Sequence, residues 1–260
     1  MKVDYSIGEV APYINWIYFF YAWGANGMPR AERRQLQAEA EQRLSRYDGR
    51  YRTHALFELS DARSEGDDII VGGVRIPCLR QQEQGSDFLC LADFVGQQDK
   101  IGIFATTVDA GLETDFDGDP YEKMMMQLLA DRLAEAAAER LHEQVRKSYW
   151  GYAPDEQLTI AEMLSERWQG IRPAVGYPSL PDTSLNFLLD QVLNLSQIGL
   201  RLTVSGAMKP HASVSGLMIA HPKARYFSVG KIAADQLADY ARRRGIPVSL
   251  MRKFLGGNIQ

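Results

Sequence analysis

The chain contains few of the residues that build metal sites and disulfides. Its 260 residues include two cysteines, Cys78 and Cys90, which stand twelve positions apart and form no CxxC pair. The four histidines are scattered, and no two of them have the i, i+4 spacing of a zinc-binding helix. We therefore expect no metal site, and we interpret both cysteines as buried free thiols in the reducing cytoplasm.

The chain also lacks an excess of positive charge and a long apolar segment. Its formal net charge of −4 gives no basic surface for nucleic acid. The most apolar run, Trp16–Trp23, is much shorter than the roughly 20 residues that span a bilayer, and the N-terminus has no secretory pattern. We expect neither a nucleic-acid nor a membrane partner. The aromatic run either fills the core or forms a partner surface.

Common catalytic motifs are missing as well. The sequence has no glycine-rich phosphate loop and no GxSxG elbow. The acidic segment Asp115–Asp119 superficially resembles a calcium loop, but Pro120 begins a helix where that loop would have to continue. Ser213 and Ser215 flank Val214 in an expected strand, which is not the setting of a catalytic nucleophile. We identify no catalytic residue.

Hydrophobic periodicity and turn residues predict separated helices and runs of strands. The clearest helix has Asp119 as its N-cap, Pro120 in its first turn and an end near Trp150–Gly151. Helices are expected at 11–23, 29–44, 119–149, 161–168, 185–195 and 233–244. Strands are expected at 53–59, 68–71, 88–94, 101–108, 200–205, 213–220 and 226–229, with a loop at 60–66. This order has no regular strand-helix alternation, which predicts an α+β fold with a mainly antiparallel sheet.

The segment Gly170–Pro178 is the most informative stretch of the chain. It places Arg172 beside Pro173, with Gly176, Tyr177 and Pro178 close behind. Proline fixes its own φ and biases the residue before it toward extended conformations, so we expect a stiff, extended loop. A guanidinium on such a loop suits bidentate capture of a carboxylate or phosphate. The alternative is an ordinary surface salt bridge.

Further segments stand in a fixed order around this loop. They are Asn15-Trp16, Phe19–Trp23, Leu79–Gln82, Cys90–Val95, Ile103–Ala105, Leu129–Ala136, Val145–Ala153, Ala212–Gly216, His221–Phe227 and Arg242–Gly245. Together they resemble the activation domain of cobalamin-dependent methionine synthase, the C-terminal module that binds S-adenosylmethionine. The resemblance implies one domain over residues 1–260, with a twisted antiparallel sheet flanked by helices and an N-terminal helical arm at residues 1–50. Because the chain begins shortly before the resemblance does, we expect a free-standing module.

The resemblance also implies a set of site residues. Arg172 is expected to hold the ligand carboxylate, and the backbone of Ala174 the adenine edge. The full expected ligand set is Arg172, Ala174, Tyr177, Tyr226, Phe227, Glu135 and Asn15, and the residues expected to face the partner and its cobalamin are Asp131, His211 and Ser213. From the residues alone, Glu135 fits a solvated helix face equally well, and both tyrosines fit core packing with a satisfied hydroxyl.

Two positions depart from the family pattern. The family commonly has an Asp-Trp pair whose carboxylate meets the ligand ammonium, whereas this chain has Asn15-Trp16. The lost ion pair is worth on the order of 1–3 kcal/mol, or roughly 5- to 150-fold in affinity. In Leu180–Thr183 the chain also lacks the histidine that usually follows the acidic residue.

The resemblance implies a function in reactivation. The module would bind S-adenosylmethionine and support reductive methylation of oxidised cobalamin on a methionine synthase core supplied in trans, with flavodoxin or a similar reductase as electron donor. Positioning and differential binding would be the contribution of the protein. The alternative is a binding or regulatory module that docks on a corrinoid protein and has lost useful affinity for S-adenosylmethionine.

Overall fold

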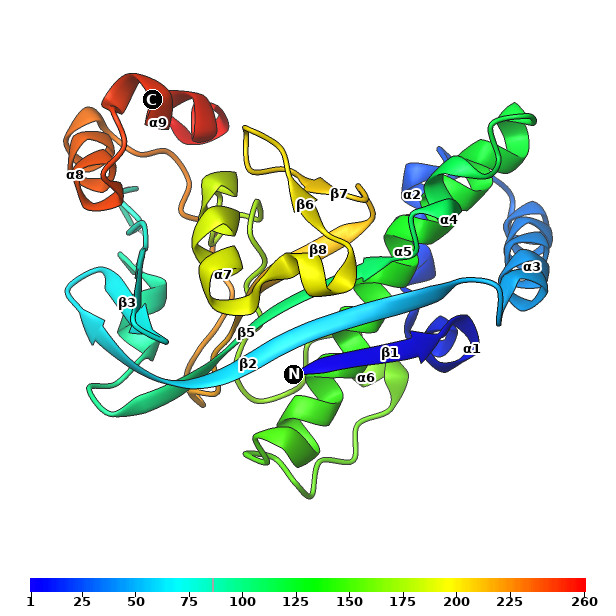
Figure 1. Cartoon of the computed structure of the whole chain (residues 1–260), viewed down its shortest axis with the longest axis horizontal. Coiled ribbons are helices and arrows are strands. Elements are labelled where there is room, and N and C mark those ends of the chain that lie inside the picture. Colours follow the sequence, from blue (N-terminus) through cyan, green and yellow to red (C-terminus); the bar gives the residue numbers. More distant parts are fainter. Residues whose placement is uncertain (86) are drawn as a thin grey trace.

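The structure is a computed structural model that describes residues 1–85 and 87–260. Within them, six strands form one antiparallel sheet in the order β4-β3-β2-β5-β8, with β1 paired to β2. The strands are β1 Lys2–Ser6, β2 Arg52–Glu65, β3 Asp68–Val71, β4 Val74–Pro77, β5 Asp99–Val108 and β8 Ser213–Met218, with β6 Arg201–Leu202 and β7 Met208–Lys209 in a separate ladder. The predicted α+β class with a mainly antiparallel sheet is confirmed (Figure 1).

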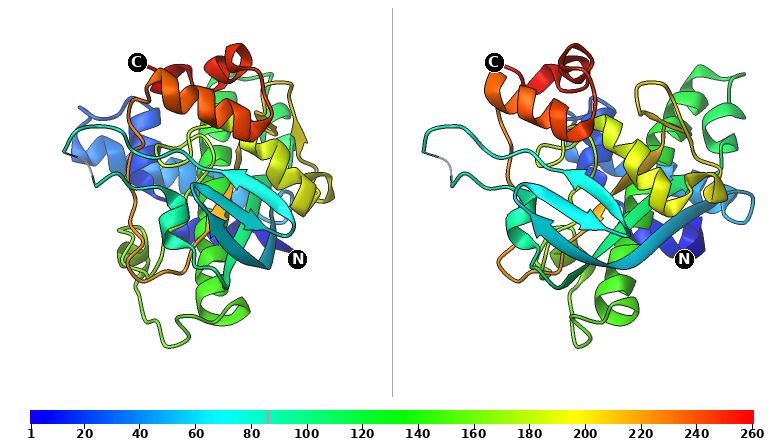
Figure 2. Two further views of the ribbon diagram at one scale, coloured as in Figure 1. Left: turned by 90° about the vertical axis from the view of Figure 1, so that its left-hand side faces the viewer. Right: turned by 60° about the vertical axis from the view of Figure 1, so that its left-hand side comes forward.

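The α-helices surround this sheet. They are α1 Ile7–Val10, α2 Trp16–Ala22, α3 Arg30–Tyr47, α4 Gly111–Thr114, α5 Pro120–Gln144, α6 Ile160–Met163, α7 Asn186–Leu193, α8 Ala234–Arg244 and α9 Val248–Phe254. The last two, α8 and α9, lie together at one end of the molecule (Figure 2). Gly245 ends α8 in a left-handed conformation, as the sequence predicts. Among the described residues, no helix combines the length and apolar character needed to cross a membrane.

Strand β5 is covered on both of its faces. From Ile101 to Val108 every residue is buried, which explains why the segment is mostly apolar and does not alternate with charged residues. Phe104 contributes to the cluster that contains α5, whereas its neighbours Ile103 and Ala105 contribute to the cluster that contains α7. The sheet therefore separates two hydrophobic cores.

Helix α5 is the central support of the first core. The Asp119 carboxylate accepts hydrogen bonds from the backbone N–H groups of Tyr121 and Glu122, so the predicted N-cap is confirmed. The helix crosses the sheet and contacts β2, β5 and β8 (Figure 1). It continues as a π-helical turn, Val145–Tyr149, and stops before Gly151, whose φ of 73° ends it as expected.

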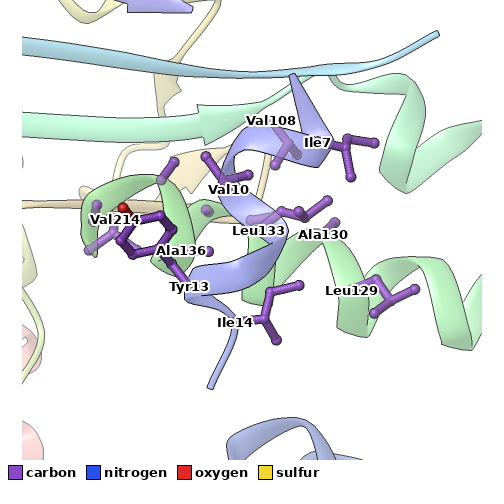
Figure 3. Close-up of a cluster of buried hydrophobic side chains, with 14 of the residues drawn as sticks. Ile7, Val10, Tyr13, Ile14, Val108, Leu129, Ala130, Leu133, Ala136 and Val214 are labelled. Carbon is purple, nitrogen blue, oxygen red and sulfur yellow. The ribbon is translucent and has the colours of Figure 1, made fainter. Parts of the chain in front are cut away.

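The first 50 residues are not wholly helical, because β1 belongs to the sheet. The expected helix at 11–23 is broken at Ile14 and Asn15 into a 3₁₀ turn and α2, whereas α3 begins after Pro29 as predicted. Figure 3 shows how the segment packs on α5, with its apolar side chains facing those of the helix. The labelled side chains on the two sides are Ile7, Val10, Tyr13 and Ile14 from the N-terminal segment, and Leu129, Ala130, Leu133 and Ala136 from α5.

Strand β2 is much longer than predicted. The expected loop at 60–66 is wrong up to Glu65, because β2 continues there and turns only at Gly66. Residues Ala62–Glu65 pair with β3, so this polar stretch has a ladder partner. Only Ala62 is buried among mostly exposed neighbours, which is the pattern of a strand with one solvated face.

Four other segments also differ from the sequence predictions. Residues 88–94 contain a 3₁₀ turn, Leu91–Phe94, instead of a strand, because the Asp93 carboxylate accepts from the Cys90 N–H and turns the backbone. The helix at 161–168 ends at Met163. At 226–229 no strand forms, and at 200–205 the ladder is limited to Arg201–Leu202. Short apolar runs of this kind do not distinguish strands from turns.

Candidate functional site

The loop that carries Arg172 lies along β8 as an irregular extra strand. Ile171 and Ile219 exchange both backbone hydrogen bonds, each at 2.9 Å. Farther along, the Pro173 carbonyl accepts from the Leu217 N–H at 3.0 Å, and the Val175 N–H donates to the Ser215 carbonyl at 2.8 Å. The predicted extended conformation is therefore confirmed for residues 171–174. From Val175 onward the loop turns instead, because Gly176 has a φ of 90° and the Tyr177 N–H donates to the Ala174 carbonyl. The loop is attached to the sheet on both sides of Arg172.

Two glycines make this attachment possible. A Cβ at Gly216 would lie 2.2 Å from the Pro173 carbonyl oxygen and 2.8 Å from the Ala174 Cα. At Gly170, whose φ is 85°, a Cβ would lie 2.2 Å from the Ile219 carbonyl oxygen. Only glycine permits backbone contacts this close, so both positions fix how the loop lies on β8.

The Arg172 guanidinium is buried and strongly paired. It forms a bidentate ion pair with Glu139 and donates to the Ala138 carbonyl at 2.8 Å, both on α5. Its Cζ lies 5.7 Å from the Trp168 ring centroid and 6.0 Å from that of Phe104. Burial alone would lower the pKa of this guanidinium, but the Glu139 carboxylate raises it above the usual value, so Arg172 is always charged.

These contacts leave one edge of the guanidinium without a protein partner. They involve Nη1 and Nη2, and among the described residues the Nε of Arg172 donates to no protein acceptor. The Arg172 side chain as a whole is 9% exposed. A carboxylate can therefore bind at the edge formed by Nε and Nη2, opposite Ala138.

Tyr226 lies directly beside the loop. Its hydroxyl accepts a hydrogen bond of 2.9 Å from the Arg172 backbone N–H, which holds the two residues next to each other. Burial raises the pKa of this phenol. Its neighbour Phe227 turns inward and packs between two hydrophobic clusters, which leaves Tyr226 as the exposed member of the pair.

Tyr177 and Glu135 meet across the gap between the loop and α5. The Tyr177 hydroxyl donates to the Glu135 carboxylate at 2.6 Å, although half of the tyrosine side chain remains exposed. Burial of the phenol and the adjacent Glu135 charge raise the Tyr177 pKa above its usual value. Glu135 is thus not simply a solvated helix residue, and Tyr177 does not pack in the core.

The backbone of Ala174 completes this face of the loop. Ala174 lies between the two hydrogen bonds that tie Pro173 and Val175 to β8, so its own N–H points away from the strand. The Ala174 carbonyl accepts from the Tyr177 N–H, but among the described residues its N–H has no acceptor. An adenine nitrogen is a suitable acceptor for this group.

Asn15 has a structural task at the same side of the molecule. It is the N-cap of α2, and its Oδ1 accepts from the Ile17 backbone N–H at 3.2 Å. Close by, the Arg132 guanidinium of α5 lies 5.9 Å from the ring centroid of Tyr18, so α2 packs next to α5. The Asn15 carbonyl is therefore already engaged, and it carries no charge for an ammonium group.

The three residues expected to face the partner lie near each other but differ in exposure. His211 is exposed, and its Nδ1 lies 3.5 Å from Asp131 on α5. Burial raises the Asp131 pKa. The Ser213 hydroxyl, in contrast, forms hydrogen bonds with the Pro210 carbonyl and with the Thr107 hydroxyl, both at 2.8 Å. Ser213 thus braces the start of β8 and is less available to a partner than His211.

Asp182, at the second departure from the family pattern, has a purely internal role. It is buried and accepts hydrogen bonds from the Tyr240 hydroxyl at 2.9 Å and the Arg244 Nε at 3.2 Å. It also caps the 3₁₀ turn that begins at Thr183. This network joins α8 to the base of the loop.

A separate hollow of about 690 Å³ lies at the far end of β2. It is lined by residues 61–63, 70–73 and 97–100, and it is open to solvent. The charged side chains on its wall, Asp61, Arg63, Asp99 and Lys100, are of balanced sign. Around Arg172, in contrast, a buried guanidinium, a backbone N–H without an acceptor in the described chain and a carboxylate lie close together. This combination is not found among the residues that line the hollow. We therefore take the region between α5 and the loop as the candidate site, and we refer to it below as the proposed cleft.

Two comparisons with known proteins agree with this fold. The sequence model for the family described as vitamin B12 dependent methionine synthase, activation domain, matches residues 6–245. The chain belongs to this family. The activation domain is also similar to a solved structure, the crystal structure of the MetH reactivation domain bound to AdoHcy, with 38% sequence identity and a TM-score of 0.93. That similarity covers 100% of this chain and 90% of the other, so the resemblance inferred from the sequence is confirmed.

Sequence reasoning missed two residues that contact Arg172 in the candidate site. Glu139 pairs with Arg172, and Trp168 lies against the same guanidinium. Glu139 stands one helical turn after Glu135, so the i, i+4 spacing on α5 was the available indication. Nothing in the local sequence marks Trp168, because its contacts come from other elements.

Buried His142 gives the activation domain a testable pH dependence. Burial and the positive charges of Arg172 and Arg146 hold its pKa well below the usual value, so it is neutral when folded. The unfolded chain takes up a proton below pH ~6.5, and the free energy of unfolding should then fall by about 1.4 kcal/mol per pH unit. Urea unfolding from pH 8 to 5 should show this slope relative to His142→Gln. Parallel curves for the two proteins would contradict it.

Proposed function

We propose that the activation domain binds S-adenosylmethionine in the cleft between α5 and the loop 170–180. The proposal is supported by the Tyr226 hydroxyl bound to the Arg172 backbone, by the Ala174 N–H on the same loop, which has no acceptor among the described residues, and by Glu135 of α5, which binds Tyr177. The ligand presents a carboxylate, an ammonium group, a sulfonium and an adenosine, and the cleft offers a partner for each polar end. The AdoHcy-bound relative, whose ligand differs from S-adenosylmethionine by the methyl group, supports this choice.

Each part of the ligand would contact a different residue. The Nε edge of Arg172 holds the carboxylate, and the negative charge of Glu135 attracts the ammonium group and the sulfonium. The free Ala174 N–H donates to the adenine edge, while Tyr177 and Tyr226 enclose the ligand from the loop side. Phe227 supports Tyr226 from the core and contacts no ligand atom in this arrangement, because it is turned inward.

The bound ligand would serve as methyl donor to a cobalamin-binding methionine synthase core supplied in trans. The sulfonium releases its methyl group without help from a protein acid or base, and the electron comes from flavodoxin or a similar reductase. The chain contributes orientation: the cleft holds the sulfur while Asp131 and His211 lie on the adjoining surface, where the partner and its cobalamin would dock.

Reactivation measured with separate components tests this function. The core enzyme, loaded with oxidised cobalamin, is mixed with the chain and the reductase, with and without S-adenosylmethionine, and methionine synthesis is followed. Activity is expected only when both the chain and S-adenosylmethionine are present. Reactivation that does not depend on S-adenosylmethionine would favour a docking module without a methyl-donor role. The engaged carbonyl of Asn15 is the observation that favours that alternative.

Replacing Asn15 by aspartate should tighten the binding of S-adenosylmethionine. Aspartate caps a helix as well as asparagine does, so α2 should be unchanged, while the new charge faces the ammonium group. We expect a gain of roughly 5- to 150-fold in affinity, measured by titration calorimetry. Asn15→Ser, which keeps a cap without a charge, is the matched control. Equal affinities for Asn15→Asp and Asn15→Ser would show that the ammonium group binds elsewhere.

A further inference from the structure

Behind Arg172, one aromatic ring is shared by two buried guanidinium groups. The Trp168 ring centroid lies 5.7 Å from the Cζ of Arg172 and 5.0 Å from the Cζ of Arg146. The imidazole of His142 meets the same ring edge-on at 5.2 Å. All of these side chains are largely or wholly removed from solvent. At such distances the ring attracts both cations, and more strongly than it would in water.

Arg146 is itself fixed. It is 1% exposed and forms a bidentate ion pair with Glu156, with contacts of 2.6 to 3.1 Å. It lies in the π-helical turn Val145–Tyr149, a type of turn that often marks functional sites. A continuous row of contacts therefore runs Glu156–Arg146–Trp168–Arg172–Glu139, from the turn after α5 to the candidate site.

The indole of Trp168 is costly if packing is its only task. Its Nε1, the Nδ1 of His142 and the Nη1 of Arg146 are buried and have no protein partner among the described residues. An unpaired buried donor costs free energy, and a leucine or phenylalanine would fill the space without that cost. The flat ring is therefore better explained by what it does for the two guanidinium groups.

We propose that Trp168 is a positioning residue that holds the Arg172 guanidinium in the orientation required by the ligand carboxylate. Glu139 and the Ala138 carbonyl bind one side of the guanidinium, and the Trp168 ring limits its tilt. The Nε edge is then presented to the cleft in one orientation, which lowers the ordering cost of binding. This inference rests on the proposed function, since it assumes that the carboxylate binds at Arg172.

The experiment compares two ligands that differ only in the carboxylate. S-adenosylmethionine and its decarboxylated analogue are titrated into the wild-type chain, Trp168→Phe and Trp168→Leu, and thermal unfolding is recorded for each protein. We expect the Kd of S-adenosylmethionine to rise about 3- to 30-fold in Trp168→Leu. Trp168→Phe should show a smaller rise, because phenylalanine keeps a weaker cation–π contact. The Kd of the decarboxylated analogue should change by less than about twofold.

A second variant and a control keep the test decisive. Glu156→Gln weakens the anchor of Arg146 without touching Trp168, and it should also reduce the preference for the carboxylate-bearing ligand. Trp23→Phe replaces a partly buried tryptophan that stacks on Phe19, away from Arg172, and should leave the preference unchanged.

The outcomes separate this inference from the proposed function. If the Trp168 variants lose affinity equally for both ligands, the positioning role is overturned while the binding site stands. If those variants fail to fold, an unchanged preference of Glu156→Gln for the carboxylate-bearing ligand would overturn the positioning role in the same way. A wild-type chain that binds neither ligand, or that does not prefer the carboxylate, would overturn both.

Discussion

Replacing Arg172 by alanine should lower the affinity for S-adenosylmethionine by about 10- to 150-fold and the free energy of unfolding by about 3–5 kcal/mol. Affinity falls because the carboxylate loses its charged, bidentate donor. Stability falls because the Glu139 carboxylate, which is 15% exposed, is left without its cation. Arg172→Lys should recover much of the stability and little of the affinity, because lysine keeps the charge but not the planar fork. Titration calorimetry and urea unfolding measure the two effects.

Two further variants separate the effects of Arg172 on binding and on folding. Adding Glu139→Gln to Arg172→Ala removes the unpaired charge, so stability should partly return while binding stays weak. Arg43→Ala breaks the Arg43–Glu122 ion pair of 2.7 Å, which has a similar exposure but joins α3 to α5 outside the cleft. It should cost stability and leave binding intact. If Arg43→Ala and Arg172→Ala weaken binding equally, the loss at Arg172 reflects the fold and not the site.

Replacing Gly216 by alanine should have the second large effect, although the change adds one methyl group. That methyl would meet the Pro173 carbonyl oxygen at 2.2 Å and the Phe104 ring at 3.0 Å, so the loop must move away from β8. We expect a loss of about 2–4 kcal/mol in the free energy of unfolding. Binding of S-adenosylmethionine should fall as well, because Arg172 and Ala174 move with the loop.

The matched control is a glycine with free space around it. A Cβ at Gly27 would contact nothing within 4 Å, and its φ lies outside the left-handed region. Gly27→Ala should therefore change the free energy of unfolding by no more than about 0.5 kcal/mol. If Gly216→Ala is as stable as Gly27→Ala and binds the ligand normally, the loop does not depend on its close contact with β8.

Features that depend on local sequence were predictable. The N-cap at Asp119, the end of α5 before Gly151 and the extended form of residues 171–174 follow from proline, glycine and capping residues within a few positions. The approach of Tyr226 to Arg172 was predictable only through the family resemblance, because 54 positions separate the two residues.

Features that depend on tertiary packing were not predictable. The polar residues Ser60–Glu65 extend β2 because β3 pairs with their far end, and nothing nearby in the sequence indicates that partner. Glu139 becomes the counter-ion of Arg172 only when the loop folds over α5. Asn15 was expected among the ligand-binding residues, and its engagement as a helix cap became visible only with the break at Ile14.

A crystal structure of the chain with S-adenosylhomocysteine, the product of methyl transfer, would show directly where the ligand binds. We expect the ligand between α5 and the loop, with its carboxylate on the Nε edge of Arg172 and its adenine on the Ala174 N–H. A ligand bound elsewhere, or one whose carboxylate avoids Arg172, would contradict this expectation.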